Sequence, residues 1–166
     1  MEVTLTVRKA NVYNEVSKTT SYTGAKKMDE DDKAYKRIMT KNEDEVQLNR
    51  FWDETCTSFC EMMKKFLKSD NAISLSPRAS IGTEFVEDMT GHQFVLELSQ
   101  SFDEALLPSM RQELTSYFVM NITAKWYVLA NKAEAQDYAV ASAALLEGIH
   151  RKACYKKKPT RPTYRH

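Results

Sequence analysis

Two pairs of residues have the types and spacing of metal ligands. Cys56 and Cys60 are four residues apart in one stretch, and His150 and Cys154 are four apart in another. Thiolates and imidazoles bind Zn²⁺ readily, so two facing helices could bring a Cys3His set around one ion. Both pairs also lie beside apolar stripes, where a free cysteine is a common small core residue. We therefore expect these side chains to pack in or near the core, without a metal.

A histidine near three carboxylates is the second candidate for chemistry. His92 follows Glu84, Glu87 and Asp88, and such a cluster could transfer protons to and from a substrate. Surface charge at a turn explains the same residues without catalysis. The chain has only four glycines, and it contains no Gly-rich phosphate loop, nucleophile elbow or paired-histidine motif. The sequence therefore predicts a protein that is not an enzyme and uses no cofactor.

The charge of the last residues is the most unusual feature of the sequence. No acidic residue follows Glu147, whereas seven basic residues do. These are Arg151, Lys152, Lys156, Lys157, Lys158, Arg161 and Arg165. Because the whole chain has a formal charge of +1 and these residues contribute seven positive charges, the rest carries −6. Pro159 and Pro162 exclude a helix and favour an extended tail, which is either a solvated terminus or an arm that orders on an acidic partner or on phosphates.

Composition limits where the protein works. No uninterrupted apolar stretch approaches the ~20 residues that span a bilayer. The first residues, MEVTLTVRKANVY, lack the basic start and the apolar block of a secretory signal. We expect a soluble protein on the cytosolic side of the membrane.

The first 24 residues predict a strand followed by a short helix. Val3, Leu5 and Val7 alternate with threonines, which is typical of a half-buried strand, so residues 1–8 are expected to form a strand-like arm. Asn11 is a suitable N-terminal cap for the helix, and Gly24 is a suitable stop.

A long helix is predicted over residues 42–68. Asn42 is a suitable cap, and Glu45 occupies the position that completes a capping box. Apolar residues then recur at spacings of three and four and predict a core-facing stripe. The stripe consists of Leu48, Trp52, Cys56, Phe59, Met63 and Phe66.

The segment of about 69–100 reads as a β-hairpin excursion. Its second strand, QFVLELS, would place Phe94, Leu96 and Leu98 on one face, after a turn at Thr90-Gly91. The segment ISLS reads as a further strand. Since a lone hairpin is marginally stable, we expect it to pack on helices, to pair with the N-terminal strand or to pair with a neighbouring subunit.

Two helices complete the chain, over about 108–130 and 132–155. The first has two apolar stripes and should therefore be buried on two sides, in the middle of a bundle or at a subunit interface. One stripe is Leu114, Phe118, Ile122, Trp126 and Leu129, and the other is Tyr117, Met120, Ala124 and Val128. Asn131, in the left-handed conformation, is expected to end this helix within a tight αα-hairpin.

These elements predict a mainly α protein of the α+β class. We expect an antiparallel helical bundle in one domain, residues 1–155, with the hairpin excursion in its middle. Residues 156–166 would form the extended, basic C-terminal arm.

This order of elements resembles that of the small head-to-tail connector (adaptor) proteins of tailed bacteriophages. Most of the resemblance lies in LTSYFVMNITAKWYVLANKAEAQDYAVASAALLEGIHRKACYKKKP. The stretches VYNEVSKTTSYTGAKK and NRFWDETCTSFCEMMKKFL also look like segments of structural proteins from phages of Bacteroides-type hosts.

The resemblance implies a mechanical function in the virion. Copies would form a homo-oligomeric ring between portal and tail, and DNA would pass through it without sequence-specific binding. The expected partners are the portal protein and tail or neck proteins, with no membrane contact, and assembly would take place in the host cytoplasm. The residues implied in docking are Lys156, Lys157, Lys158, Arg161, Tyr164 and Arg165.

Two alternatives stay open. The chain is longer at its front than a minimal connector bundle, which suits a tail-completion or neck role. A small cytosolic regulator that binds nucleic acid through its basic C-terminal segment is the other alternative.

Overall fold

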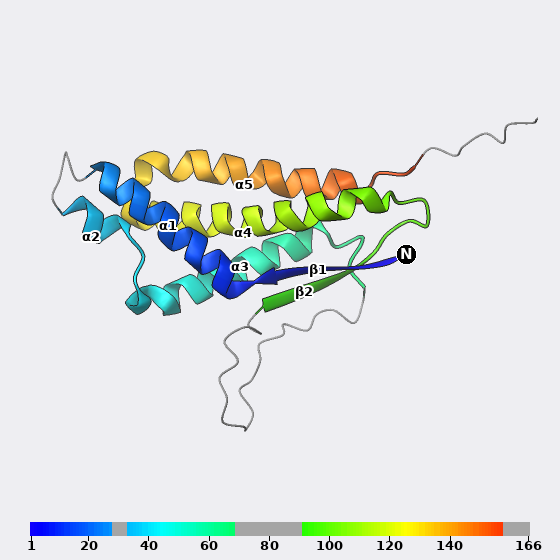
Figure 1. Ribbon diagram of the computed structural model, residues 1–166, viewed down its shortest axis with the longest axis horizontal. Helices are drawn as coiled ribbons and strands as arrows, with labels where there is room; N and C mark the ends of the chain where they lie inside the picture. Colours follow the sequence, from blue (N-terminus) through cyan, green and yellow to red (C-terminus); the bar gives the residue numbers. More distant parts are fainter. Residues whose placement is uncertain (28–32, 69–90, 158–166) are drawn as a thin grey trace, which may run out of the picture.

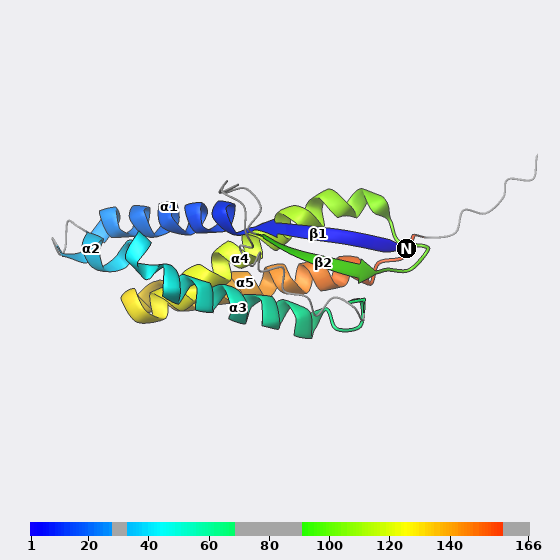
Figure 2. The same cartoon turned by 90° about the horizontal axis from the view of Figure 1, so that it is seen from below.

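The computed structural model describes residues 1–27, 33–68 and 91–157. Long helices dominate it, beside a two-stranded antiparallel sheet, so the predicted α+β class is confirmed (Figures 1 and 2). The strands are β1 (Glu2–Arg8) and β2 (Gly91–Glu97), and the helices are α1 (Lys9–Lys27), α2 (Ala34–Ile38), α3 (Glu45–Met62), α4 (Leu107–Ala130) and α5 (Lys132–Ala153).

Helix α4 is the centre of the bundle. It contacts α1, α3, α5 and β1, and α5 lies along its length (Figures 1 and 2). Leu114, Phe118 and Tyr117, which come from both predicted stripes, are buried. The prediction of burial on two sides is therefore confirmed, with the middle of a bundle as its reason. Val128 and Leu129 are exceptions at 53% and 64% exposed, because no described element packs on that side of the last turn.

The sheet joins the N-terminal strand to the middle of the chain. β1 and β2 are antiparallel, with Leu5 opposite Phe94 and Val3 opposite Leu96. These four side chains lie on the buried face, as the alternation predicts. The N-terminal strand is thus a partner of the second predicted hairpin strand. The segment ISLS and the first hairpin strand fall within 69–90, outside the described residues.

Helix α1 shows that Gly24 is not a helix stop. The helix runs from Lys9 to Lys27, three residues beyond this glycine. Helix α2 passes so close that a Cβ atom added at Gly24 would lie 3.1 Å from the Cα of Tyr35. Glycine at this position therefore permits close contact between two helices. No local signal in the sequence distinguishes that use from a C-terminal cap.

The start of α3 differs slightly from the prediction. Asn42–Asp44 form a single 3-10 turn, and the α-helix begins at Glu45. The Asp44 carboxylate accepts a hydrogen bond of 2.8 Å from the Lys41 amide, so the cap lies one residue earlier than expected.

The predicted end of the same helix, at residue 68, is wrong. Helix α3 ends at Met62, and the chain then joins the outer edge of β2. The Glu97 amide donates to the Phe66 carbonyl over 2.6 Å, and the Lys68 amide donates to the Val95 carbonyl over 3.2 Å. These two bonds satisfy groups at the sheet edge that further helix would leave unpaired.

One residue connects α4 and α5, which confirms the predicted tight αα-hairpin. Its conformation differs from the prediction, because Asn131 has φ −155° and ψ 74° and is not left-handed. Its side-chain oxygen accepts a hydrogen bond of 2.8 Å from the Lys27 ammonium group. The contact with α1 thus stabilises this conformation of the connection.

Candidate docking surface at the end of α5

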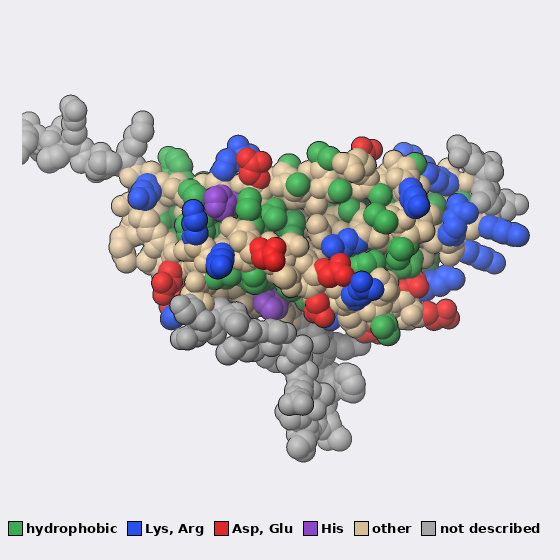
Figure 3. Space-filling model, turned by 180° about the vertical axis from the view of Figure 1, so that it is seen from behind, with side chains coloured by type: hydrophobic (Ala, Val, Ile, Leu, Met, Phe, Trp, Pro, Cys, Tyr) green, Lys and Arg blue, Asp and Glu red, His purple; other side chains and the backbone are tan. Residues whose placement is uncertain are grey.

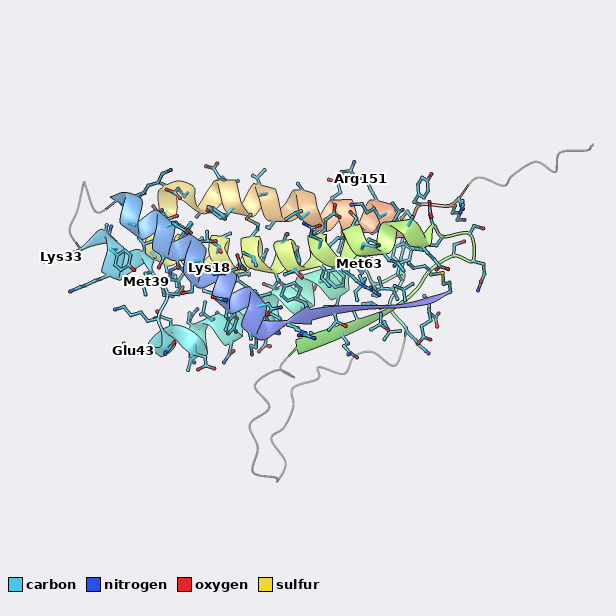
Figure 4. All side chains as sticks on the ribbon, viewed as in Figure 1. Lys18, Lys33, Met39, Glu43, Met63 and Arg151 are labelled. Atoms are coloured by element: carbon cyan, nitrogen blue, oxygen red, sulfur yellow. The ribbon has the colours of Figure 1, made fainter. Side chains whose placement is uncertain are left out.

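The last turn of α5 is basic. It contains His150, Arg151 and Lys152, at the helix end where cations are favoured by the macrodipole. Lys152 forms an ion pair with Glu113 of α4, and Arg151 lies 3.7 Å from Glu147 one turn earlier. Figure 4 shows Arg151 projecting from the outer side of α5.

The predicted docking arm begins with two exposed lysines. Lys156 and Lys157 follow α5 and are exposed, as their predicted role requires. The Lys157 amide donates to the Ser101 carbonyl over 2.7 Å. The chain is therefore held against the β2–α4 connection at the point where the arm starts. The other predicted docking residues, Lys158, Arg161, Tyr164 and Arg165, lie outside the described residues.

A groove of about 840 Å³ lies between α5 and the start of α4, beside this point. Its apolar lining is Leu106, Ala141, Ala144, Leu145 and Gly148, and its polar lining is Asp103, Glu113, Arg151, Lys152 and Tyr155. One end of the groove and the start of the arm coincide, since Tyr155 is two residues before Lys157 and Asp103 is two residues after Ser101.

Glu113, which lines the groove, has one paired and one unpaired carboxylate oxygen among the described residues. One carboxylate oxygen, Oε1, accepts a hydrogen bond from Lys152. The other, Oε2, is buried and has no hydrogen-bond partner among the described residues. A buried carboxylate oxygen without a donor costs free energy, so this atom favours a ligand that carries a donor.

Small side chains on α5 make room for the groove. A Cβ atom added at Gly148 would lie 3.4 Å from Glu113 Oε2, in ordinary contact, while a longer side chain would extend into the groove. None of the predictions from the sequence pointed to this groove. The spacing of Ala141, Ala144 and Gly148 on one side of a helix is the signal that could have indicated it.

The candidate zinc ligands do not form a site. Within residues 1–27, 33–68 and 91–157, no three His, Cys, Asp or Glu side chains are placed to hold a metal ion. Cys56 is buried, and burial raises the pKa of its thiol to about 12. Cys154 is exposed. The His150 ring packs edge-on against the Phe66 ring, with the two ring centroids 5.7 Å apart.

His92 is not a surface residue, which corrects the expectation of charge at a turn. It is 9% exposed on the core-facing side of β2, and its ring centroid lies 4.4 Å from that of Phe94. Burial lowers the pKa of His92, and the negative charge of Asp53 on α3 partly opposes this shift. Glu84, Glu87 and Asp88 lie outside the described residues, so the proposed acid-base cluster is not defined here.

The rear of the molecule carries hydrophobic side chains among its charges (Figure 3). Val128, Leu129 and Val140, from α4 and α5, are more than half exposed. Exposed apolar side chains of this kind suit contact with another protein surface.

None of the described helices is long and apolar enough to cross a membrane. No family model, curated protein or solved structure matches the chain.

Proposed function

We propose that this protein is a non-enzymatic virion structural protein, a head-to-tail connector that forms a ring between portal and tail. The observation that carries the proposal is the position of the arm. The hydrogen bond from Lys157 to Ser101 fixes where the basic segment leaves the α4–α5 hairpin. A folded body with a basic arm fixed at one end suits docking to an acidic neighbour.

The arm would bind by charge and by one aromatic side chain. Its lysines and arginines would form charge-assisted hydrogen bonds with carboxylates of a partner, and Tyr164 would supply an apolar anchor. Pro159 and Pro162 restrict the unbound arm and so reduce the entropy that docking costs.

The body would form the ring itself. Exposed apolar side chains on α4 and α5, namely Val128, Leu129 and Val140, are candidates for contact between copies. The chain before the basic segment carries −6 overall, which suits a channel that does not retain DNA.

Light scattering across a concentration series, at low and high salt, tests the ring. The full chain should form a large closed oligomer, and a chain ending at Lys157 should lose it while keeping the Ser101 contact. A full-length variant with Lys158, Arg161 and Arg165 changed to glutamine separates the role of charge from that of length. A full chain that stays monomeric at every concentration, and that does not bind a portal ring, would reject the connector role.

A small nucleic-acid-binding regulator is the second candidate. Arg151, Lys156 and Lys157 are all exposed around the end of α5, as a phosphate contact requires. Titration with DNA and RNA at several salt concentrations distinguishes the two proposals. A regulator should bind strongly, with a steep salt dependence that truncation after Lys157 reduces. Weak binding that truncation does not change would exclude it.

A further inference from the structure

We propose that residues 158–166 bind, within the same copy, in the groove between α4 and α5. A lysine or arginine of this segment would donate to Glu113 Oε2. The contact itself does not depend on the connector role. Only its consequence for docking rests on the proposed function.

The segment begins beside the groove and is long enough to fill it. Lys157 is fixed at Ser101, next to the end of the groove that Asp103 and Tyr155 line. Nine further residues extend up to about 30 Å. The groove follows α5 from Ala141 to Lys152, which is about 17 Å of helix, and continues to Tyr155 just beyond the helix end.

The segment is positively charged, and the groove offers it one acidic group that is not already in an ion pair among the described residues. Two basic residues line the groove, Arg151 and Lys152, and both already have acidic partners, Glu147 and Glu113. The lining is neutral in total, because Asp103 and Glu113 balance these two basic residues, but Asp103 has no ion pair within the described part of the chain. The segment supplies three cations, Lys158, Arg161 and Arg165.

The hydrogen-bond donors and the apolar side chains of residues 158–166 also match groups in the groove lining. Glu113 Oε2 is buried without a hydrogen-bond partner in the described part of the chain, and an ammonium or guanidinium group would satisfy it. Leu106 and Leu145 offer apolar surface to Tyr164 and the two prolines of the segment. Proline lacks a backbone donor, so it enters an apolar groove without leaving an N–H group unpaired.

Under the proposed function, this contact would keep the docking arm bound to its own copy until a partner binds. A partner would have to displace residues 158–166 from the groove before binding them. The apparent affinity of the partner for the arm would equal its intrinsic affinity multiplied by the fraction of time that the arm is released.

NMR of the ¹⁵N-labelled full chain tests the contact against a chain that ends at Lys157. Within residues 1–27, 33–68 and 91–157, the core includes no residue beyond Ala153, so a chain that ends at Lys157 keeps all of the described core. Amide resonances of residues 103–106 and 141–148 should shift on truncation. A synthetic peptide of residues 158–166, added to the truncated chain, should restore them. Unchanged resonances in this region would overturn the proposal.

Two full-length variants locate the contact. Gly148→Leu should fill the groove and reproduce the shifts caused by truncation around residues 103–106, whereas Ala143→Leu, exposed on the same helix outside the groove lining, should not. Glu113→Gln should weaken binding of the added peptide to the truncated chain several-fold. Equal effects of the two leucine variants, or an unchanged peptide affinity, would overturn the proposed site.

Dilution identifies which copy supplies the segment. Contact within one copy gives shifts that do not depend on protein concentration, whereas shifts that vanish on dilution would overturn it in favour of exchange between copies. If NMR shows no contact in the groove, the light-scattering test of the ring still stands. If light scattering shows no ring, the NMR test of the contact still stands. The two proposals therefore fail separately.

Discussion

The side-chain oxygen of Asn121 on α4 lies 2.8 Å from the hydroxyl oxygen of Thr55 on α3. The Asn121 amide nitrogen lies 3.4 Å from the Ser142 hydroxyl on α5, so one amide connects three helices. The Thr55 hydroxyl also lies 2.7 Å from the Phe51 carbonyl, and because it has one proton it donates to one acceptor at a time.

Changing Thr55→Val should lower the free energy of unfolding by about 1–2 kcal/mol, because it leaves the Asn121 oxygen without this donor. Urea denaturation measures the change. Thr57→Val is the matched control, since Thr57 is exposed on the same helix and its hydroxyl donates to the Asp53 carbonyl one turn earlier. Its cost should stay within about 0.5 kcal/mol. Equal costs for the two variants would show that the link between helices contributes nothing.

Two glycines within helices should respond differently to alanine. Gly148→Ala should raise the free energy of unfolding by about 0.5–1 kcal/mol, because alanine favours helix and its Cβ makes ordinary contacts. Gly24→Ala should stabilise less or destabilise, since its Cβ would lie 3.1 Å from the Tyr35 Cα and push α2 away. Thermal and urea unfolding of both variants provide the comparison, and a greater gain for Gly24→Ala would contradict the close contact.

Acid should destabilise the protein through His92. Burial lowers the pKa of this residue in the folded state, so below the unfolded value of about 6.5 the unfolded chain binds the proton more readily. Stability therefore falls as the pH drops from about 6.5 towards the lower folded pKa. Urea denaturation at several pH values should show a shallower loss for His92→Leu than for the natural chain. Parallel pH profiles would contradict this assignment.

The three cysteines should react in the order of their exposure. Cys154 is exposed, Cys60 is half-buried and Cys56 is buried, and burial raises the pKa of the Cys56 thiol to about 12. A thiol reagent at pH 8 should therefore label Cys154 first and Cys56 last, as peptide mass spectrometry would show. Rapid labelling of Cys56 in the folded protein would contradict its burial.

Periodicity predicted the parts of the fold that depend on local pattern. The alternation of Val3, Leu5 and Val7 identified β1, and the two stripes around Phe118 and Tyr117 identified α4 as buried on two sides. Each pattern records directly which side of an element meets the core.

Contacts between distant segments account for the errors. Gly24 has the residue type of a helix stop, yet contact with α2 decides its use. Residues 66–68 leave the helix because β2 offers hydrogen bonds that lie far away in the sequence. The groove beside Glu113 required the relative positions of α4 and α5, which neither helix pattern contains.

The pairing of β1 with β2 also determines when the sheet can form during synthesis of the chain. The two strands are separated by more than eighty residues, so β1 leaves the ribosome long before its partner is made. Until then, Val3, Leu5 and Val7 have no strand to join, and the growing chain carries an apolar segment that chaperones can bind. Helices α4 and α5, which are adjacent in sequence, can associate as soon as both are complete. Closing the sheet is therefore expected to be a slow, late step of folding.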